Sequence, residues 1–154
     1  MNVYISADIE GVGGVVRSEY SMPAGRDYAV ARKLMTGEIN AAASGAFEAG
    51  ASQVVVADSH NVGLNLIPEE LDERVQLIMG MPRTLCMMTG IDRGFGAVFL
   101  VGYHAMAETA DSTLAHTFTA RVAEVRMNGR RLGEIGLSAA LAGAFQVPVV
   151  LVTG

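Results

Sequence analysis

The sequence has little cysteine, no cluster of positive charge and no long apolar run. Cys86 is the only cysteine, so no disulfide can form within the chain, which fits a reducing compartment. The formal net charge is -5, and without a basic patch we expect no nucleic acid and no membrane as partners. No apolar run approaches the roughly 20 residues of a membrane span, and the N-terminus lacks the basic start of a signal peptide. We therefore expect a cytoplasmic protein, with Cys86 buried and unreactive between apolar neighbours.

Apolar residues make up 51% of the 154 residues, which is enough for one domain with a sizeable core. Short apolar segments alternate along the chain with segments of helical periodicity. We predict strands at residues 2–9, 52–60, 74–80, 96–105 and 147–154, helices near 27–49 and at 134–145, and a β-hairpin at 114–134 that turns at Asn128-Gly129.

This alternation of strands and helices is typical of an α/β fold. Several of the strands are apolar throughout, which indicates burial on both faces and a largely parallel sheet flanked by helices. The hairpin is then an excursion from that sheet. The last predicted strand ends at Gly154, where the following loop would usually carry function. We therefore expect residues 1–154 to be a single α/β domain and the N-terminal part of a longer chain.

The stretch "YISADIEGVGG", residues 4–14, runs from an apolar strand into two acids and a glycine-rich turn. Because side chains alternate across a strand, Asp8 and Glu10 should share one face. Two like charges that close raise each other's pKa unless a cation lies between them. A solvated strand edge, a phosphate-binding loop and half of a metal site are the open alternatives. The phosphate loop is the weakest, since neither a third glycine nor a Walker lysine follows.

Ligands of open α/β sheets bind beyond the carboxyl ends of the strands, and the polar residues predicted at these ends form a distinct set. They are Asp8 and Glu10 after the first strand, Asp58, Ser59 and His60 after the second, and His104 after the fourth. Glu134 and His116 are placed to close the same pocket. Carboxylate and imidazole together are ligands for zinc or a similar metal.

Each of these residues also has a structural explanation when taken alone. His104 has the surroundings of a core histidine, His60 could be satisfied by Asp58, and Glu134 suits the first turn of a helix. All three histidines of the chain, however, fall at or near the same predicted edge. If each residue had only a structural role, several unrelated explanations would have to apply at one edge of the sheet. We therefore favour a metal site at the carboxyl ends of the strands.

Five motifs in order, "SADIEGVGG", "ADSHN", "GYHA", "LAHTF" and "GEIGL", resemble the zinc-dependent D-aminopeptidase family typified by DppA, of the bacterial dipeptide-transport operon. The resemblance spans the whole chain but only the N-terminal half of a usual member. It implies two zinc ions per chain bridged by Asp8, with Glu10 and His60 on one ion and His104 and Glu134 on the other. It also implies that His116 is the catalytic residue.

The resemblance further implies an activity and an assembly. Family members cleave N-terminal D-amino acids, such as D-Ala, from short peptides and form ring-shaped decamers. We therefore expect a metallopeptidase that acts on a short peptide and assembles as a homo-oligomer. One alternative is a two-metal phosphoesterase, for which only Arg17 and Arg121 are candidate phosphate ligands. The other is a non-catalytic metal-binding or assembly module.

Overall fold

The computed structural model describes residues 1–154 and is built around a five-stranded parallel sheet. Its strands lie in the order β3-β2-β1-β4-β7, and every pairing is parallel. A separate two-stranded antiparallel ladder joins β5 and β6. The predicted α/β class is therefore confirmed. The strands are β1 (Asn2–Ala7), β2 (Gln53–Asp58), β3 (Val75–Ile78), β4 (Ala97–Val101), β5 (Arg126–Met127), β6 (Arg130–Arg131) and β7 (Val149–Val152).

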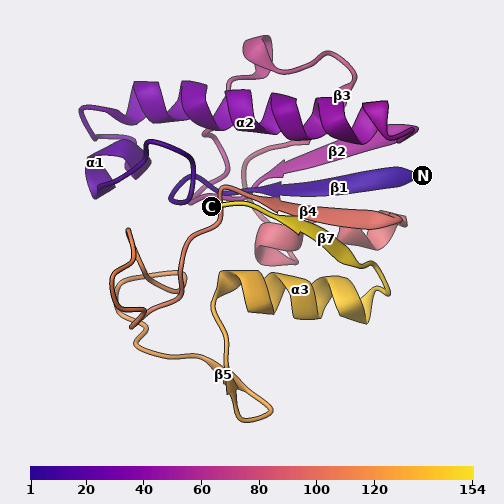
Figure 1. Cartoon of the computed structure of the whole chain (residues 1–154). Helices are drawn as coiled ribbons and strands as arrows, with labels where there is room; N and C mark the ends of the chain where they lie inside the picture. The colour runs from indigo at the N-terminus through magenta and orange to yellow at the C-terminus, as the bar shows by residue number, and fades with distance from the viewer.

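Helices cover both faces of the sheet (Figure 1). The long helix α2 (Tyr28–Glu48) packs on one face, where it meets Val3 and Ile5 of β1. On the other face, Tyr4 packs with residues of α3 (Glu134–Ala144) and of the 3-10 helix η2 (Cys86–Met88). Burial on both faces explains why the central strands are apolar throughout. The remaining short helices are α1 (Ser18–Ser21), η1 (Pro68–Glu70) and η3 (Ile91–Arg93).

Helix α2 has the extent that the sequence predicts. Its buried residues include Ala31, Met35 and Ile39, which recur every four residues on the face toward the sheet. The helix ends before Gly50, whose φ of 89° is in the left-handed region. The N–H groups of Gly50 and Ala51 then donate to carbonyls of the last turn at 2.9 Å each, which satisfies groups that the helix end leaves free.

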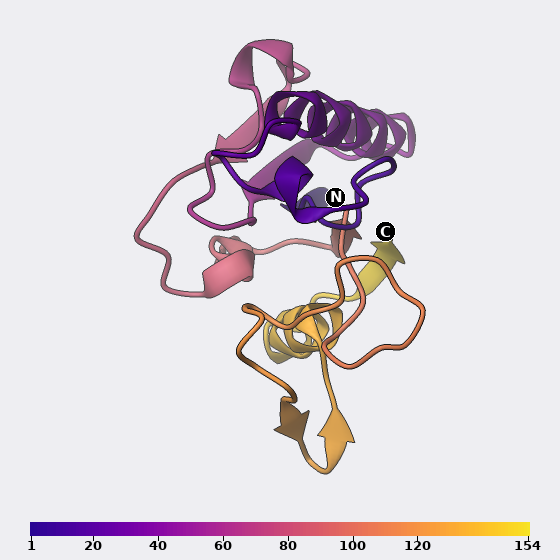
Figure 2. The same ribbon diagram turned by 90° about the vertical axis from the view of Figure 1, so that its left-hand side faces the viewer.

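The order of the strands creates a switch point between β1 and β4. From β1 the chain winds outward through β2 to β3, and it then returns to β4 and β7 on the other side of β1. The loops after β1 and β4 therefore depart in different directions, and ligands of open α/β sheets bind at such a point. In Figure 2 the carboxyl ends of the strands face the viewer, with α2 above them and α3 below.

Some local predictions are wrong. Strand β1 ends at Ala7, so Asp8 and Glu10 lie in the following turn and do not share a strand face. The hairpin does turn at Asn128-Gly129, but its ladder has only two residue pairs, and His116 lies in a loop rather than on a strand. Cys86 is exposed, with its φ at 50°. None of the helices is long and apolar enough to cross a membrane.

Two glycines allow the loops after β1 and β4 to cross in direct contact. The N–H of Gly11 donates to the carbonyl of Gly102 at 2.8 Å, and the N–H of Asp8 donates to that of Val101 at 2.9 Å. A Cβ on Gly102 would overlap the carbonyl oxygen of Asp8, and the φ of Gly102 is 72°. Only glycine fits both the conformation and the space. This crossing sets where the Asp8 backbone lies.

We predict that Gly102→Ala lowers the free energy of unfolding by more than about 1 kcal/mol, because the new methyl group meets backbone at a strained φ. Gly37→Ala is the matched control, since nothing lies within 4 Å of a Cβ there. In the interior of α2 that change should stabilise by about 0.5–1 kcal/mol. Urea denaturation of both variants measures the difference. Equal stability of the two variants would contradict the close crossing.

Candidate metal centre

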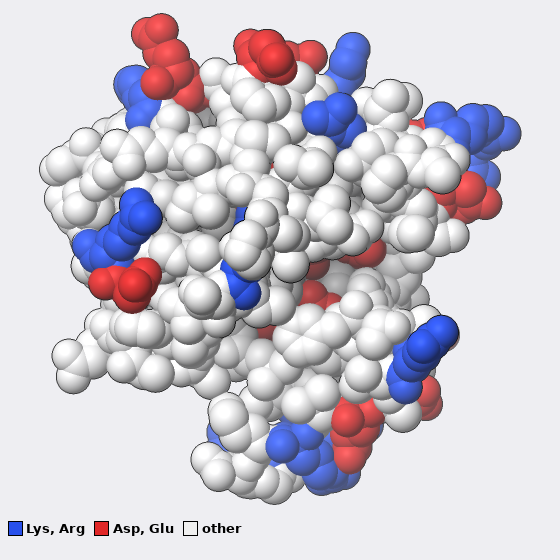
Figure 3. Space-filling view, turned by 180° about the vertical axis from the view of Figure 1, so that it is seen from behind, with Lys and Arg blue, Asp and Glu red and all other residues white.

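The loops after β1 and β2, the start of α3 and the segment around His116 enclose a cavity of about 750 Å³. Figure 3 shows acidic side chains inside a hollow between the upper and lower parts of the molecule. The acids that line the cavity are Asp8, Glu10 and Glu134. Residues from four separate segments thus meet at the carboxyl ends of the strands, as the sequence predicts.

His60 lies against the two acids of the β1 loop. Its Nδ1 is 2.8 Å from Glu10 Oε2 and 3.3 Å from Asp8 Oδ1. Its Nε2 lies 2.8 Å from the backbone carbonyl of Ser21, which can only accept a hydrogen bond. Nε2 therefore carries the proton, and Nδ1 is the nitrogen with a free lone pair toward the carboxylates.

His104 approaches the same aspartate from the other side. Its Nε2 is 3.5 Å from Asp8 Oδ2 and 3.2 Å from Glu134 Oε1. Its Nδ1 lies 2.9 Å from the carbonyl of Ala105, which fixes the proton on Nδ1 and leaves Nε2 as the donor atom for a metal. Asp8 thus lies between the two histidines, with one carboxylate oxygen toward each.

His116 stacks on His104, with ring centroids 4.0 Å apart and planes 5° from parallel. Its Nε2 is 3.9 Å from Glu134 Oε1, and its Nδ1 lies 2.8 Å from the carbonyl of Leu114. The side chain of His116 is 24% exposed, whereas that of His104 is 1% exposed. His116 is therefore the histidine of this pair that a molecule in the cavity can reach.

The pKa values of the site reflect a shortage of positive charge. Burial raises the pKa of Asp8 above its ordinary value. Burial alone would lower the pKa of His60, but the carboxylates of Asp8 and Glu10 beside its ring outweigh this effect and raise that pKa to about 10. Burial would also lower the pKa of His104, but the nearby Glu134 and Asp8 outweigh this effect and raise that pKa to about 9. Buried carboxylates that draw protons onto neighbouring imidazoles are suited to bind cations in their place.

The atoms without hydrogen bonds test whether metal ions fit here. Asp8 Oδ2, Glu10 Oε2 and His104 Nε2 are buried and have no hydrogen-bond partner. Such atoms are rare because their desolvation is not compensated. Ligand atoms gather within 4.8 Å of one another in two groups, one of Asp8, Glu10 and His104 and one of His104, His116 and Glu134. Nitrogen and oxygen donors in these groups are a set that zinc accepts.

A sequence model of the peptidase family M55, described as D-aminopeptidase, matches residues 1–154. The chain belongs to this D-aminopeptidase family. A D-aminopeptidase of Bacillus subtilis (strain 168) is 36% identical to it over 154 residues, which are 100% of this chain and 56% of that protein. The solved structure of the Zn-dependent D-aminopeptidase DppA from Bacillus subtilis, a self-compartmentalizing protease, matches with a TM-score of 0.94 at 36% identity.

That structural match covers 97% of this chain and 54% of the DppA chain. The chain thus spans about half the length of the relatives that it matches. At this identity and TM-score, the sheet and the crossing loops of the M55 member described here have the same architecture as those of a zinc-dependent enzyme. The family resemblance seen in the five motifs is therefore confirmed.

Asp58 does not join the cluster of candidate ligands in this M55 domain, although it lies at a strand end. Its carboxylate accepts hydrogen bonds from the backbone N–H groups of Asn65 and Leu66 at 2.5 and 2.7 Å, and from Asn65 Nδ2 at 2.7 Å. Asn65 Nδ2 also donates to the carbonyl of His60 at 2.7 Å. Asp58 and Asn65 therefore hold the loop that presents His60. Sequence patterns gave no signal for Asn65, or for the Ser21 carbonyl.

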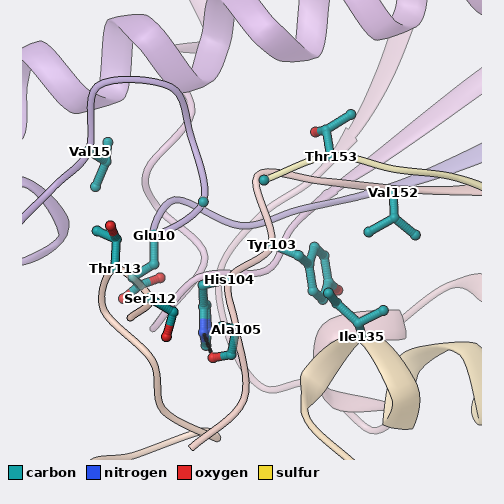
Figure 4. Close-up of a pocket in the computed structure, with 12 residues that line it drawn as sticks. Glu10, Val15, Tyr103, His104, Ala105, Ser112, Thr113, Ile135, Val152 and Thr153 are labelled. Carbon is teal, nitrogen blue, oxygen red and sulfur yellow. Dashed lines mark hydrogen bonds between the residues drawn. The ribbon is translucent and has the colours of Figure 1, made fainter. Parts of the chain in front are cut away.

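A second pocket, of about 480 Å³, is lined by Glu10 and His104. Figure 4 shows these two side chains on its wall, near Ser112 and Thr113, with Tyr103 and Ile135 farther along it. His104 lines this pocket but not the main cavity, and Glu10 lines both.

We predict that zinc binds at this centre and raises the melting temperature, because it binds the folded state alone. At a hundred times its Kd, a single-site ligand stabilises by about 2.7 kcal/mol. Asp8→Ala should remove this effect, since the carboxylate of Asp8 lies between His60 and His104. Glu48→Gln, on the surface of α2, is the control that should keep it. Zinc content by mass spectrometry and thermal melts with and without chelator measure both. Equal zinc content in Asp8→Ala and the parent protein would refute the assignment.

Proposed function

We propose that this protein is a metal-dependent aminopeptidase that hydrolyses N-terminal D-amino acids, such as D-Ala, from short peptides through a dinuclear zinc site. The observation that carries the proposal is the position of Asp8 between His60 and His104, with Asp8 Oδ2 and His104 Nε2 buried and lacking a hydrogen-bond partner. Membership of the D-aminopeptidase family supports the reaction. The Zn-dependence of the DppA enzyme supports the metal.

The two halves of the cluster suggest how two ions would be held. Glu10 and His60 would bind one ion, His104 and Glu134 the other, and Asp8 would bridge them. Asp8 suits this role because its two oxygens face different histidines, Oδ1 toward His60 and Oδ2 toward His104. Two zinc ions held by these residues would supply Lewis-acid polarisation of a peptide carbonyl and a bound water of near-neutral pKa.

His116 is the proton carrier in this proposal. The Leu114 carbonyl accepts a hydrogen bond from Nδ1–H, so in the neutral ring Nε2 has a free lone pair. Nε2 can take a proton from the attacking water and then deliver it to the leaving amine. Glu134 Oε1, at 3.9 Å, stabilises the imidazolium that forms between these two steps. Stacking on His104 holds the ring in place.

The lining of the cavity is poorly suited to a phosphoester. Its three acids are the proposed metal ligands, and no lysine or arginine is among the other residues that line it. A phosphoester dianion would therefore lack the arginine or lysine that usually binds its oxygens. Arg17 is engaged by Asp27 at 2.7 Å, and Arg121 does not line the cavity. A phosphoesterase is therefore the less favoured alternative.

Assembly and location complete the proposal. The DppA structure is that of a self-compartmentalizing protease, and we propose that this protein is likewise a homo-oligomer, a decamer by its family resemblance. We also propose that it acts in the cytoplasm on short peptides.

We predict that His116→Ala in the full-length protein keeps its zinc but loses about 10²- to 10⁴-fold in kcat, the usual contribution of one acid–base group. His60→Ala is the matched control at the same cavity, and it should lose zinc as well as rate. Metal content and kcat on a D-alanyl peptide are measured on the same preparations. If His116→Ala loses zinc in step with activity, His116 is a ligand and the proposed division of roles is wrong.

A second prediction concerns the substrate amine. A D-alanyl peptide should be cleaved, while its N-acetylated form should not, because acetylation converts the terminal amine that an aminopeptidase requires into a non-basic amide. The L-alanyl peptide should be cleaved more slowly than the D-alanyl peptide. Amine release followed by chromatography measures all three rates. Comparable cleavage of the acetylated peptide would contradict an aminopeptidase.

A further inference from the structure

Next to the candidate ligands, the buried Ser6 contacts the hydroxyls of the buried Tyr103 and the half-buried Ser59, and we call these three hydroxyls the hydroxyl clamp. We propose that the hydroxyl clamp fixes the spacing of the two loops that carry His60 and His104. Ser6 and Tyr103 are then positioning residues, since they act on the site only through other groups. This inference rests on the metal-dependent function proposed above.

The contacts of Ser6 carry the inference. Its Oγ lies 2.7 Å from Ser59 Oγ, 2.8 Å from the hydroxyl of Tyr103 and 2.8 Å from the carbonyl oxygen of Met87. Ser6 is 0% exposed and Tyr103 is 1% exposed. Hydroxyls buried this deeply are paired with few exceptions, and losing one partner leaves the others without compensation for their desolvation.

The members of the hydroxyl clamp are sequence neighbours of the metal-binding residues. Ser59 directly precedes His60, Tyr103 directly precedes His104, and Ser6 lies two residues before Asp8. One hydroxyl on β1 therefore ties together the loops after β1, β2 and β4. A shift of either histidine loop would break a contact of Ser6 at the same time as it moved an imidazole away from Asp8.

The Met87 carbonyl can only accept, and it lies 2.8 Å from both Ser6 Oγ and Ser59 Oγ. One arrangement that satisfies all three hydroxyls runs from Tyr103 to Ser6, from Ser6 to Ser59 and from Ser59 to this carbonyl. In that arrangement each hydroxyl donates once, and such chains of hydrogen bonds strengthen one another. The carbonyl belongs to η2, whose residues Cys86 and Met87 line the main cavity.

Tyr4 provides a matched control for Tyr103. Both tyrosines are buried, and both hydroxyls reach the Met87 region. The Tyr4 hydroxyl donates to the carbonyls of Met87 and Thr89 at 3.3 and 3.0 Å, but it does not contact Ser6 or Ser59. Each Tyr→Phe change removes one oxygen atom and leaves the ring in place. Only Tyr103→Phe removes a hydroxyl that contacts Ser6.

The test measures the zinc affinity of full-length protein by competition with a chromophoric chelator, beside the melting temperature of the zinc-free form. We expect Tyr103→Phe to weaken zinc binding by about 10- to 100-fold, the usual effect of losing an outer partner of a metal ligand. Tyr4→Phe should lower the melting temperature to a similar extent and leave zinc affinity unchanged. Ser6→Ala should weaken zinc binding as Tyr103→Phe does, and the two changes together should be less than additive because they break the same bond.

Two results would overturn the inference. One is a Tyr103→Phe protein that binds zinc as tightly as the parent. The other is a Tyr4→Phe protein that loses as much affinity as Tyr103→Phe, which would make the effect one of general stability. Failure of the proposed function would give a different result. The zinc-loaded parent would then release no D-amino acid, while Tyr103→Phe would still bind zinc more weakly than the parent and Tyr4→Phe.

Discussion

The carboxylate of Asp8 is buried between two histidines, with one oxygen 3.3 Å from His60 and the other 3.5 Å from His104. A carboxylate removed from water in this way needs positive charge nearby. The adjacent acids Glu10 and Glu134 increase that need rather than meet it. The remaining features of the site follow from this constraint, since the histidines, their tautomers and the unpartnered oxygens are all arranged around one buried negative charge.

The backbone around Asp8 is held as firmly as its side chain. The crossing of the β1 and β4 loops at Gly11 and Gly102 places its peptide group, and the hydroxyl clamp behind it connects the same loops through side chains. Carbonyl oxygens of Ser21, Ala105 and Leu114 set the protonated nitrogen of each histidine. A site that must hold its ligands at fixed separation gains from such support, because misplaced ligands bind metal weakly.

The contacts of the segment between β4 and α3 explain why the predicted hairpin has a much shorter ladder than expected. Its backbone donors are engaged by the site: the N–H of His116 donates to Ala105 at 3.2 Å, and that of Phe118 donates to Glu134 Oε1 at 2.7 Å. Leu114 and Phe118 also have positive φ, which no regular strand contains. The turn at Asn128-Gly129 depends only on local sequence, so the sequence predicts it correctly. The residues before it form tertiary contacts in place of a longer antiparallel ladder. Cys86 is exposed for a related reason, because η2 turns Met87 and Met88 inward instead.

The sequence by itself determined the strands, the two long helices and the group of residues at the strand ends, because periodicity and turn chemistry are local properties of the chain. It also contained the five motifs of the family. Only the tertiary structure decided that Asp58 supports a loop while Asp8 faces two histidines, and that Ser6 and Tyr103 meet behind them. Hydrogen-bond partners far apart in the chain distinguish these residues, and such pairings depend on the strand order and loop crossings that folding creates.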